Sequence, residues 1–232
     1  MPAGLPASRS ASELRDADLA ELTAAVVQRV RDEISGAASR FVPVAVSARH
    51  VHLTREVLDE LYGRGYELTR ERELSQPGEF AAGECVTLIG SRMRSIEGVR
   101  VLGPLRRYAQ VELARTDGVS LGLELPVRES GNLSGSSPIV LVGPRGAVSL
   151  KEGAIRPARH IHATEKDAAL MGLGDGQTVS ARVRGKKGVV FENVIVKVRS
   201  DFRLEMHLDT DDANAADVCC DMLAEIKVNR GS

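Results

Sequence analysis

From Phe41 onward, the hydrophobic positions fall in short runs rich in valine, and glycine or proline separates most runs. Runs of this kind are typical of β-strands. A helical pattern appears over only three short stretches, residues 55–61, 165–170 and 211–222. Many short strands with few helices predict a mainly β protein, built from barrels or sandwiches with short capping helices. The expected strands lie at residues 42–47, 85–90, 99–103, 110–114, 120–127, 138–143, 147–150, 178–184, 189–198 and 204–209.

The first forty residues have a different pattern. Residues 1–11 are small and polar, and the stretch that follows has an apolar stripe at helical spacing. With Ser12 as a candidate N-cap, the pattern predicts an amphipathic helix over residues 12–35, followed by a short linker. Two uses fit such a helix: it packs on its own domain, or it docks on a partner protein. The stripe consists of Leu19, Leu22, Val26, Val27, Val30 and Ile34.

One phrase occurs twice, as ARHVH at residues 48–52 and as ARHIH at residues 158–162. Each copy is followed by a threonine that could cap a helix, Thr54 or Thr164, and then by a glycine that could end it, Gly63 or Gly172. The repeat predicts two related units. We expect an N-terminal segment over residues 1–40, a first domain over 41–126 and a second over 127–232, with elements that could be exchanged between the two domains.

The repeated phrase contains four of the five histidines of the chain. On an extended strand, residues two apart point to the same face, so each His-x-His pair can converge on one point. Paired imidazoles are a natural metal chelate, and zinc is the commonest fit. The pairs could form one four-histidine site, or two sites that are each completed by another residue. The candidates for completion are His207, Glu112, Glu124, Asp209 and Cys85.

Composition narrows the possible partners. The chain has 232 residues and a net charge of −1, which disfavours general nucleic-acid binding. No apolar run is long enough to cross a membrane, so a membrane is not an expected partner either. The cysteine count is odd and includes the adjacent pair Cys219 and Cys220, which indicates a reducing compartment.

Two stretches are suited to binding an anion. Arg106 and Arg107 follow a Gly-Pro turn, and the run ESGNLSGSSP at residues 129–138 could present backbone N–H groups to a phosphate. The run could equally be an exposed hairpin loop. It is not a P-loop, because the Gly-Lys-Ser/Thr ending is missing.

The chain resembles the phosphate propanoyltransferases of the propanediol-utilisation type, over about residues 41–228. The motifs that carry the resemblance are VPVAVSARHVHLT, ELSQPGEF, VRVLGPLRRYAQVEL, ESGNLSGSSPIVLVGPRG and ARHIHAT. These enzymes are phosphotransacylases associated with bacterial microcompartments. They convert acyl-CoA and phosphate reversibly into acyl phosphate and CoA. The resemblance implies two related β-barrel domains and an N-terminal amphipathic helix that serves as an encapsulation peptide.

The resemblance also implies two zinc ions per chain, and it implies which residues form the site. Arg106 matches the catalytic arginine that holds phosphate. The ligands of one metal ion are matched by His50, His52 and Glu112. The ligands of the other are matched by His160, His162 and His207. The positions expected to contact CoA are Ser47, Arg72, Arg100, Leu102 and Asn214. Arg72 stands where the family would have lysine, so the positive charge is kept but the compact ammonium group is not.

The expected function is therefore a metal-dependent acyltransferase that acts on propanoyl-CoA, or on acetyl-CoA, with phosphate. The expected location is the lumen of a microcompartment within the cytoplasm, where residues 12–35 bind shell or core proteins, and we expect a homo-oligomer. Two other readings use the same residues. A zinc-dependent hydrolase would cleave a CoA thioester or a phosphoester with water, and a scaffold protein would use zinc only for stability.

Overall fold

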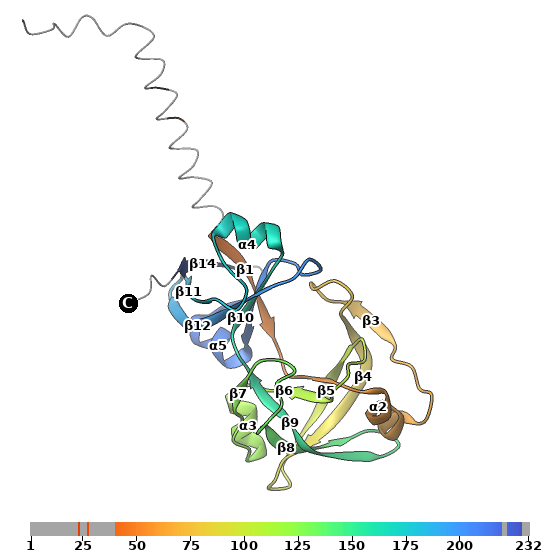
Figure 1. Ribbon diagram of the computed structural model, residues 1–232. Helices are drawn as coiled ribbons and strands as arrows, with labels where there is room; N and C mark the ends of the chain where they lie inside the picture. The colour runs from red at the N-terminus through yellow and green to blue at the C-terminus, as the bar shows by residue number, and fades with distance from the viewer. Residues whose placement is uncertain (1–22, 24–26, 28–39, 220–221, 229–232) are drawn as a thin grey trace, which may run out of the picture. The chain divides into compact units, whose positions relative to one another are not determined.

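The computed structural model describes residues 23, 27, 40–219 and 222–228. The chain forms two compact units, residues 1–40 and 41–232. Apart from Thr23 and Val27, the helix expected over residues 12–35 lies outside the described residues. All the strands and helices whose bounds follow belong to the second unit, which is mainly β and contains two closed barrels of six strands each (Figure 1).

The first barrel is closed by six strand pairings. Around the barrel the order is β9 (Ala147–Pro157), β6 (Gln110–Glu112), β2 (His50–His52), β5 (Ser95–Gly103), β4 (Phe80–Ile89) and β8 (Ser137–Val142), and β8 pairs again with β9. Two further strands extend it at the edges: β3 (Arg70–Glu73) pairs with β4, and β7 (Val127–Arg128) pairs with β9.

The second barrel repeats this arrangement. Its order is β1 (Phe41–Ser47), β13 (Glu205–Asp209), β10 (His160–Ala163), β12 (Val189–Val198), β11 (Thr178–Val183) and β14 (Leu223–Val228). Each pairing has the same direction as its counterpart. The β1–β13 and β10–β12 pairs are parallel, as are β9–β6 and β2–β5, and the other pairs that close the barrels are antiparallel. The duplication seen in two histidine phrases therefore extends to whole barrels.

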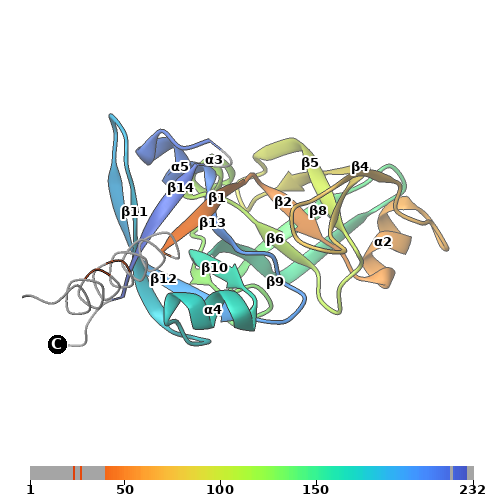
Figure 2. The ribbon, with the colours of Figure 1, turned by 90° about the horizontal axis from the view of Figure 1, so that it is seen from above.

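The two halves of the chain exchange their first strands. β1 precedes the strands of the first barrel in sequence but belongs to the second barrel. The chain then forms the first barrel, which β9 closes, and returns to the second barrel at β10. Figure 1 shows β1 in orange among the teal and blue strands, and Figure 2 shows the strands of the two barrels side by side. The boundary expected after residue 126 falls within the first barrel, because β7, β8 and β9 all pair there.

Four short helices accompany the barrels: α2 (Arg55–Tyr62), α3 (Arg115–Leu121), α4 (Glu165–Met171) and α5 (Thr210–Ala216). The expected caps are confirmed for α2 and α4, where the Thr54 and Thr164 hydroxyls accept backbone N–H groups. Gly172 follows α4 in the left-handed conformation that glycine favours. Helix α5 is shorter than the predicted stretch 211–222, because Asp217 turns left-handed and ends it.

The prediction of a strand over residues 120–127 was wrong. Its first two residues end helix α3, and only Val127 joins a strand. Gly122 adopts a positive φ of 72°, which ends the helix and redirects the chain. Alternating leucines in this stretch gave the β pattern, yet Leu121 and Leu123 are buried on either side of the turn.

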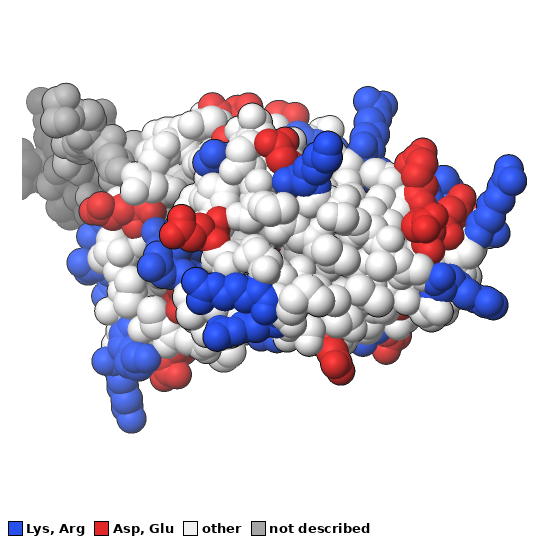
Figure 3. Space-filling view, turned by 90° about the horizontal axis from the view of Figure 1, so that it is seen from below, with Lys and Arg blue, Asp and Glu red and all other residues white. Residues whose placement is uncertain are grey.

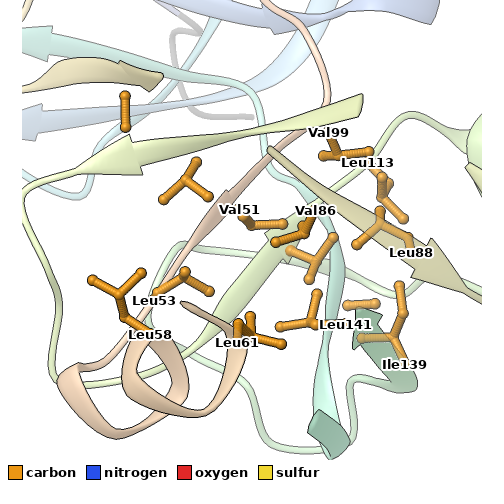
Figure 4. Close-up of a cluster of buried hydrophobic side chains, with 14 of the residues drawn as sticks. Val51, Leu53, Leu58, Leu61, Val86, Leu88, Val99, Leu113, Ile139 and Leu141 are labelled. Atoms are coloured by element: carbon orange, nitrogen blue, oxygen red, sulfur yellow. The ribbon is translucent and has the colours of Figure 1, made fainter. Parts of the chain in front are cut away.

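Each barrel has its own aliphatic core. Figure 4 shows the first, in which Val51 of β2, Val86 and Leu88 of β4 and Leu141 of β8 meet Leu58 and Leu61 of α2. The second core includes Val44, Ile161, Val196 and Met206, all 1% exposed or less. No helix in the described part of the chain is long and apolar enough to cross a membrane. On the face drawn in Figure 3, basic and acidic side chains are interspersed.

Candidate metal centre between two barrels

Strand register assembles the first cluster. β2 and β6 pair antiparallel with His50 opposite Glu112, and His52 lies two residues along on the same face of β2. All three side chains are buried, and their ligand atoms lie within 4.8 Å of one another. His50 Nε2 and Glu112 Oε2 lie 3.5 Å apart. One carboxylate and two imidazoles are a ligand set that zinc takes in proteins.

The second cluster is built in the same way. β10 and β13 pair antiparallel with His160 opposite His207, so His207 occupies the position that Glu112 has in the first barrel. The ligand atoms of His160, His162 and His207 also lie within 4.8 Å of one another. The structure therefore forms two separate three-residue groups from the histidine pairs. Glu124, Asp209 and Cys85 belong to neither group, and Asp209 instead accepts the Asp212 N–H as the cap of α5.

The alanine of each repeated phrase fixes the orientation of the histidine two residues later. His50 Nδ1 lies 2.8 Å from the Ala48 carbonyl oxygen, and His160 Nδ1 lies 2.9 Å from that of Ala158. A carbonyl oxygen can only accept, so Nδ1 must carry the proton and Nε2 keeps its lone pair. This arrangement, with one ring nitrogen donating to the backbone, is typical of histidines that bind a metal through the other.

Three other ring nitrogens fit a metal ion. His52 Nδ1, His162 Nδ1 and His207 Nε2 are buried and have no hydrogen-bond partner among the described residues. An unpartnered buried polar atom is costly, and coordination of a cation would remove that cost. Both clusters contain such atoms, so the residues present fit two metal ions.

The electrostatic surroundings keep these imidazoles neutral. Burial is the main cause that lowers the pKa of His162 to about 2 and of His207 to about 4, and it also lowers the pKa values of His52 and His160. A positive charge on a neighbouring histidine adds to each shift. For His207 that neighbour is His50 of the other barrel, so the two clusters act on each other. Neutral imidazole is the form that binds metal.

A network of polar side chains holds the Glu112 carboxylate in place. The fully buried Gln110 donates from Nε2 to Glu112 Oε1 at 2.6 Å and to Ser130 Oγ at 2.8 Å. Its Oε1 accepts the Gly131 N–H. The Gly/Ser run 129–138 thus reaches the first cluster through its first residues. Sequence reasoning missed Gln110, although a glutamine two residues before a ligand on the same strand face was a usable signal.

Arg106 lies beside this network. Its guanidinium donates to Ser130 Oγ at 3.1 Å and to Glu79 at 2.8 Å, and its charge contributes to the lowered pKa of His52. The adjacent Arg107 is exposed and lies outside the cavity. Of the two arginines that follow the Gly-Pro turn, Arg106 is therefore the one at the site.

Glu205 was also missed, and it supports the second cluster. Its Oε2 lies 3.4 Å from His207 Nε2. The Ser75 hydroxyl and the Gln76 amide, both from the loop between β3 and β4, donate to the same oxygen. Gln76 also bonds the backbone of Arg203. The motif ELSQPGEF, to which no role was assigned from the sequence, therefore connects the first barrel to the second cluster.

Both clusters open on one cavity of about 960 Å³. All six predicted ligands and Arg106 line it, and so do the expected CoA contacts Ser47, Arg72, Arg100 and Leu102. Asn214 does not line it. It is exposed on α5, where its backbone carbonyl accepts from Lys187 Nζ at 2.9 Å. The cavity has room for a phosphate and part of a larger thioester.

The chain is similar to known proteins over most of its length. A model of the family described as phosphate propanoyltransferase matches residues 43–219. A phosphate propanoyltransferase of Lachnoclostridium phytofermentans is 46% identical, over 92% of this chain and 100% of that protein. One of Thermotoga maritima is 51% identical over 75% of this chain and 82% of its own length. One of Salmonella typhimurium is 42% identical over 84% of this chain and 91% of its own length.

Proposed function

The chain belongs to the phosphate propanoyltransferase family, and on this basis we propose that it is a phosphotransacylase. It interconverts a short-chain acyl-CoA plus phosphate with acyl phosphate plus CoA. Propanoyl-CoA is the proposed substrate, with acetyl-CoA as a second. The observation that carries the proposal is the single cavity that joins two metal-ligand groups to Arg106.

The proposed cofactor is zinc, with two ions per chain. His50, His52 and Glu112 would hold one ion, and His160, His162 and His207 the other. When bound, the ions supply Lewis-acid stabilisation of negative charge on the carbonyl oxygen and on the leaving sulfur. Zinc suits this role because it accepts both nitrogen and thiolate ligands.

In the proposed reaction, Arg106 holds the phosphate and turns one of its oxygens toward the thioester carbonyl. The new bond joins that oxygen to the acyl carbon, and the carbon–sulfur bond then breaks with its electron pair on CoA. No side chain becomes acylated. Because Ser130 and Glu79 fix the guanidinium, little reorganisation accompanies binding. The proposed CoA contacts are Ser47, Arg72, Arg100 and Leu102, which line the cavity, and Asn214, which lies outside it.

Residues 12–35 are the proposed encapsulation peptide. Their apolar stripe would bind shell or core proteins and so locate the enzyme in the lumen of a microcompartment, and it would also favour a homo-oligomer. This part of the proposal rests on the sequence pattern and the family resemblance, because the segment lies almost entirely outside the described residues.

Phosphate dependence tests the reaction. CoA release from propanoyl-, acetyl- and butanoyl-CoA should require phosphate and should yield acyl phosphate in equal amount, with metal analysis on the same sample. CoA release at the same rate without phosphate would instead indicate the hydrolase. If metal-loaded protein releases CoA from none of the three esters, the remaining interpretation is a scaffold protein that uses zinc only for stability.

A further inference from the structure

A lysine without an assigned role lies beside the second cluster. Lys197 is on β12, directly opposite His162 in the parallel pairing with β10. Its side chain lines the cavity and is 22% exposed. Its charge helps to lower the pKa values of His160, His162 and His207. Lys197 is therefore a cation among neutral imidazoles, in a place where a metal ion would add further positive charge.

The positive charge of Lys197 is only weakly compensated. Within the described residues its one ion pair is with Glu129, at 3.5 Å from Nζ to Oε2. That separation is longer than a good hydrogen bond, and the Glu129 side chain is 50% exposed. An ammonium group has three donors, and within the described residues Glu129 is the one partner of this group, so donors remain for a ligand in the cavity that Lys197 lines.

The duplication shows that the barrel does not need a cation at this position. His50 pairs with Arg100, and Val51 with Val101, just as His160 pairs with Ile195 and Ile161 with Val196. One residue further along, Lys197 in the second barrel has Leu102 as its counterpart in the first. Both residues line the cavity. The same strand position is therefore filled by an apolar side chain beside one cluster and by a cation beside the other, which points to a ligand and not to folding.

Lys197 and Arg106 approach the same short segment from opposite barrels. Lys197 pairs with Glu129, and Arg106 donates to the next residue, Ser130. We propose that Lys197 binds the phosphate group together with Arg106, so that the transferred anion lies between the two barrels. This inference rests on the proposed function. Inorganic phosphate carries between one and two negative charges at neutral pH, which is well matched to two cations from different sides.

The test is Lys197→Met in the metal-loaded, full-length enzyme. We expect the KM for phosphate to rise about tenfold or more, because a charged hydrogen bond is lost, while the KM for propanoyl-CoA stays within about twofold. Lys197→Arg should recover part of the loss. Lys166→Met, which removes an exposed lysine of α4 outside the cavity, is the matched control and should change neither constant.

Glu129→Gln separates a binding role from a structural one. If Lys197 only ties β12 to the 129–138 loop, removing its partner should reproduce the Lys197→Met phenotype, and the proposal would be wrong. If Lys197 binds phosphate, freeing it from Glu129 should leave the KM for phosphate unchanged or lower it.

Direct binding gives a readout that does not depend on turnover. Calorimetric titration of metal-loaded protein with inorganic phosphate should show weaker binding for Lys197→Met than for the unmodified enzyme, by about the same factor as the change in KM. Equal binding by both proteins would overturn the role of Lys197. Because phosphate-dependent CoA release by the unmodified enzyme is measured separately, failure of this inference is distinguishable from failure of the proposed function.

Discussion

At the scale of single residues, every polar member of the repeated phrase has the same task in both copies. The arginine anchors a helix: Arg49 pairs with Asp117 of α3 at 3.0 Å, and Arg159 pairs with Asp212 of α5 at 2.6 Å. The alanine carbonyl orients the next histidine. The phrase therefore couples each ligand strand to the helix that follows its partner strand, which explains why more than the histidines is repeated.

Arg106→Ala should lower kcat/KM for phosphate by about 100-fold or more, because a charge-assisted contact to the anion and to the transition state is lost. Steady-state kinetics at several phosphate concentrations measure this. Arg107→Ala is the matched control, since Arg107 is the exposed neighbour outside the cavity. Turnover close to that of the unmodified enzyme, with metal content retained, would rule out the role of Arg106.

Replacing one histidine should empty one cluster only. His160→Ala removes a ligand from the second group, so metal content should fall from about two ions per chain to about one. His50→Ala should have the same effect on the first group. Elemental analysis after gel filtration is the measurement. Two ions retained by His160→Ala would contradict the assignment of separate sites.

Tyr62 allows a pH-dependent test of stability. Its hydroxyl donates to the Cys85 carbonyl at 2.6 Å, and burial, followed by the charge of Glu84, raises its pKa to about 12. Tyr62→Phe should cost about 1 kcal/mol of unfolding free energy at neutral pH. Above about pH 10 the unfolded tyrosine ionises before the folded one, so the unmodified protein loses stability and the difference should shrink. Urea unfolding at pH 7 and pH 10.5 measures both values, and a difference that grows with pH would contradict the argument.

At the scale of elements, the helix caps are the clearest local interactions. The Thr164 hydroxyl accepts the Asp167 N–H at 3.1 Å, and Asp167 accepts the Thr164 N–H in return. Thr164→Ala should therefore cost about 1 kcal/mol. Thermal unfolding of the two proteins measures the loss. Thr164→Ser keeps the hydroxyl and serves as control, and an equal loss in both variants would show that the cap is not the cause.

Elements with a strong local pattern were predictable, and those held by distant contacts were not. The run 189–198 forms β12 with the predicted bounds, and the capped stretches 55–61 and 165–170 form α2 and α4. Helix α3 was missed because its sequence RTDGVSL includes a glycine and β-branched residues, which are poor helix formers. It is held instead by Asp117, which accepts the Ala114 N–H and pairs with Arg49.

At the scale of the whole second unit, alternation of side chains along a strand was enough to pair the two histidines of each repeated phrase. It was not enough to decide between one site and two, or to find the residues that support the ligands. Gln110 and Glu205 lie two residues before the ligands Glu112 and His207, at equivalent positions of β6 and β13. Their partners Ser130, Ser75 and Gln76 come from loops far away in the sequence. Such contacts depend on how the barrels close, and the exchange of β1 and β9 through parallel pairing leaves no local pattern.

The connection between the barrels leads to a last prediction. Gln76 is 4% exposed and makes three hydrogen bonds to the second barrel, two through Nε2 and one through Oε1. Gln76→Ala leaves the Arg203 N–H without its partner and Glu205 with one donor fewer, so the loss of unfolding free energy should be about 1–3 kcal/mol.

Thr116→Val is the comparison variant. Thr116 bonds Asp211 across the barrels at an exposed position, so this variant should lose only about 0.5 kcal/mol of unfolding free energy. Denaturant unfolding of both variants decides: an equal or larger loss for Thr116→Val would mean that the buried loop is not the main connection. Glu205 Oε2 lies 3.4 Å from His207 Nε2. Gln76→Ala should therefore also weaken metal binding at the second cluster and leave metal binding at the first cluster unchanged.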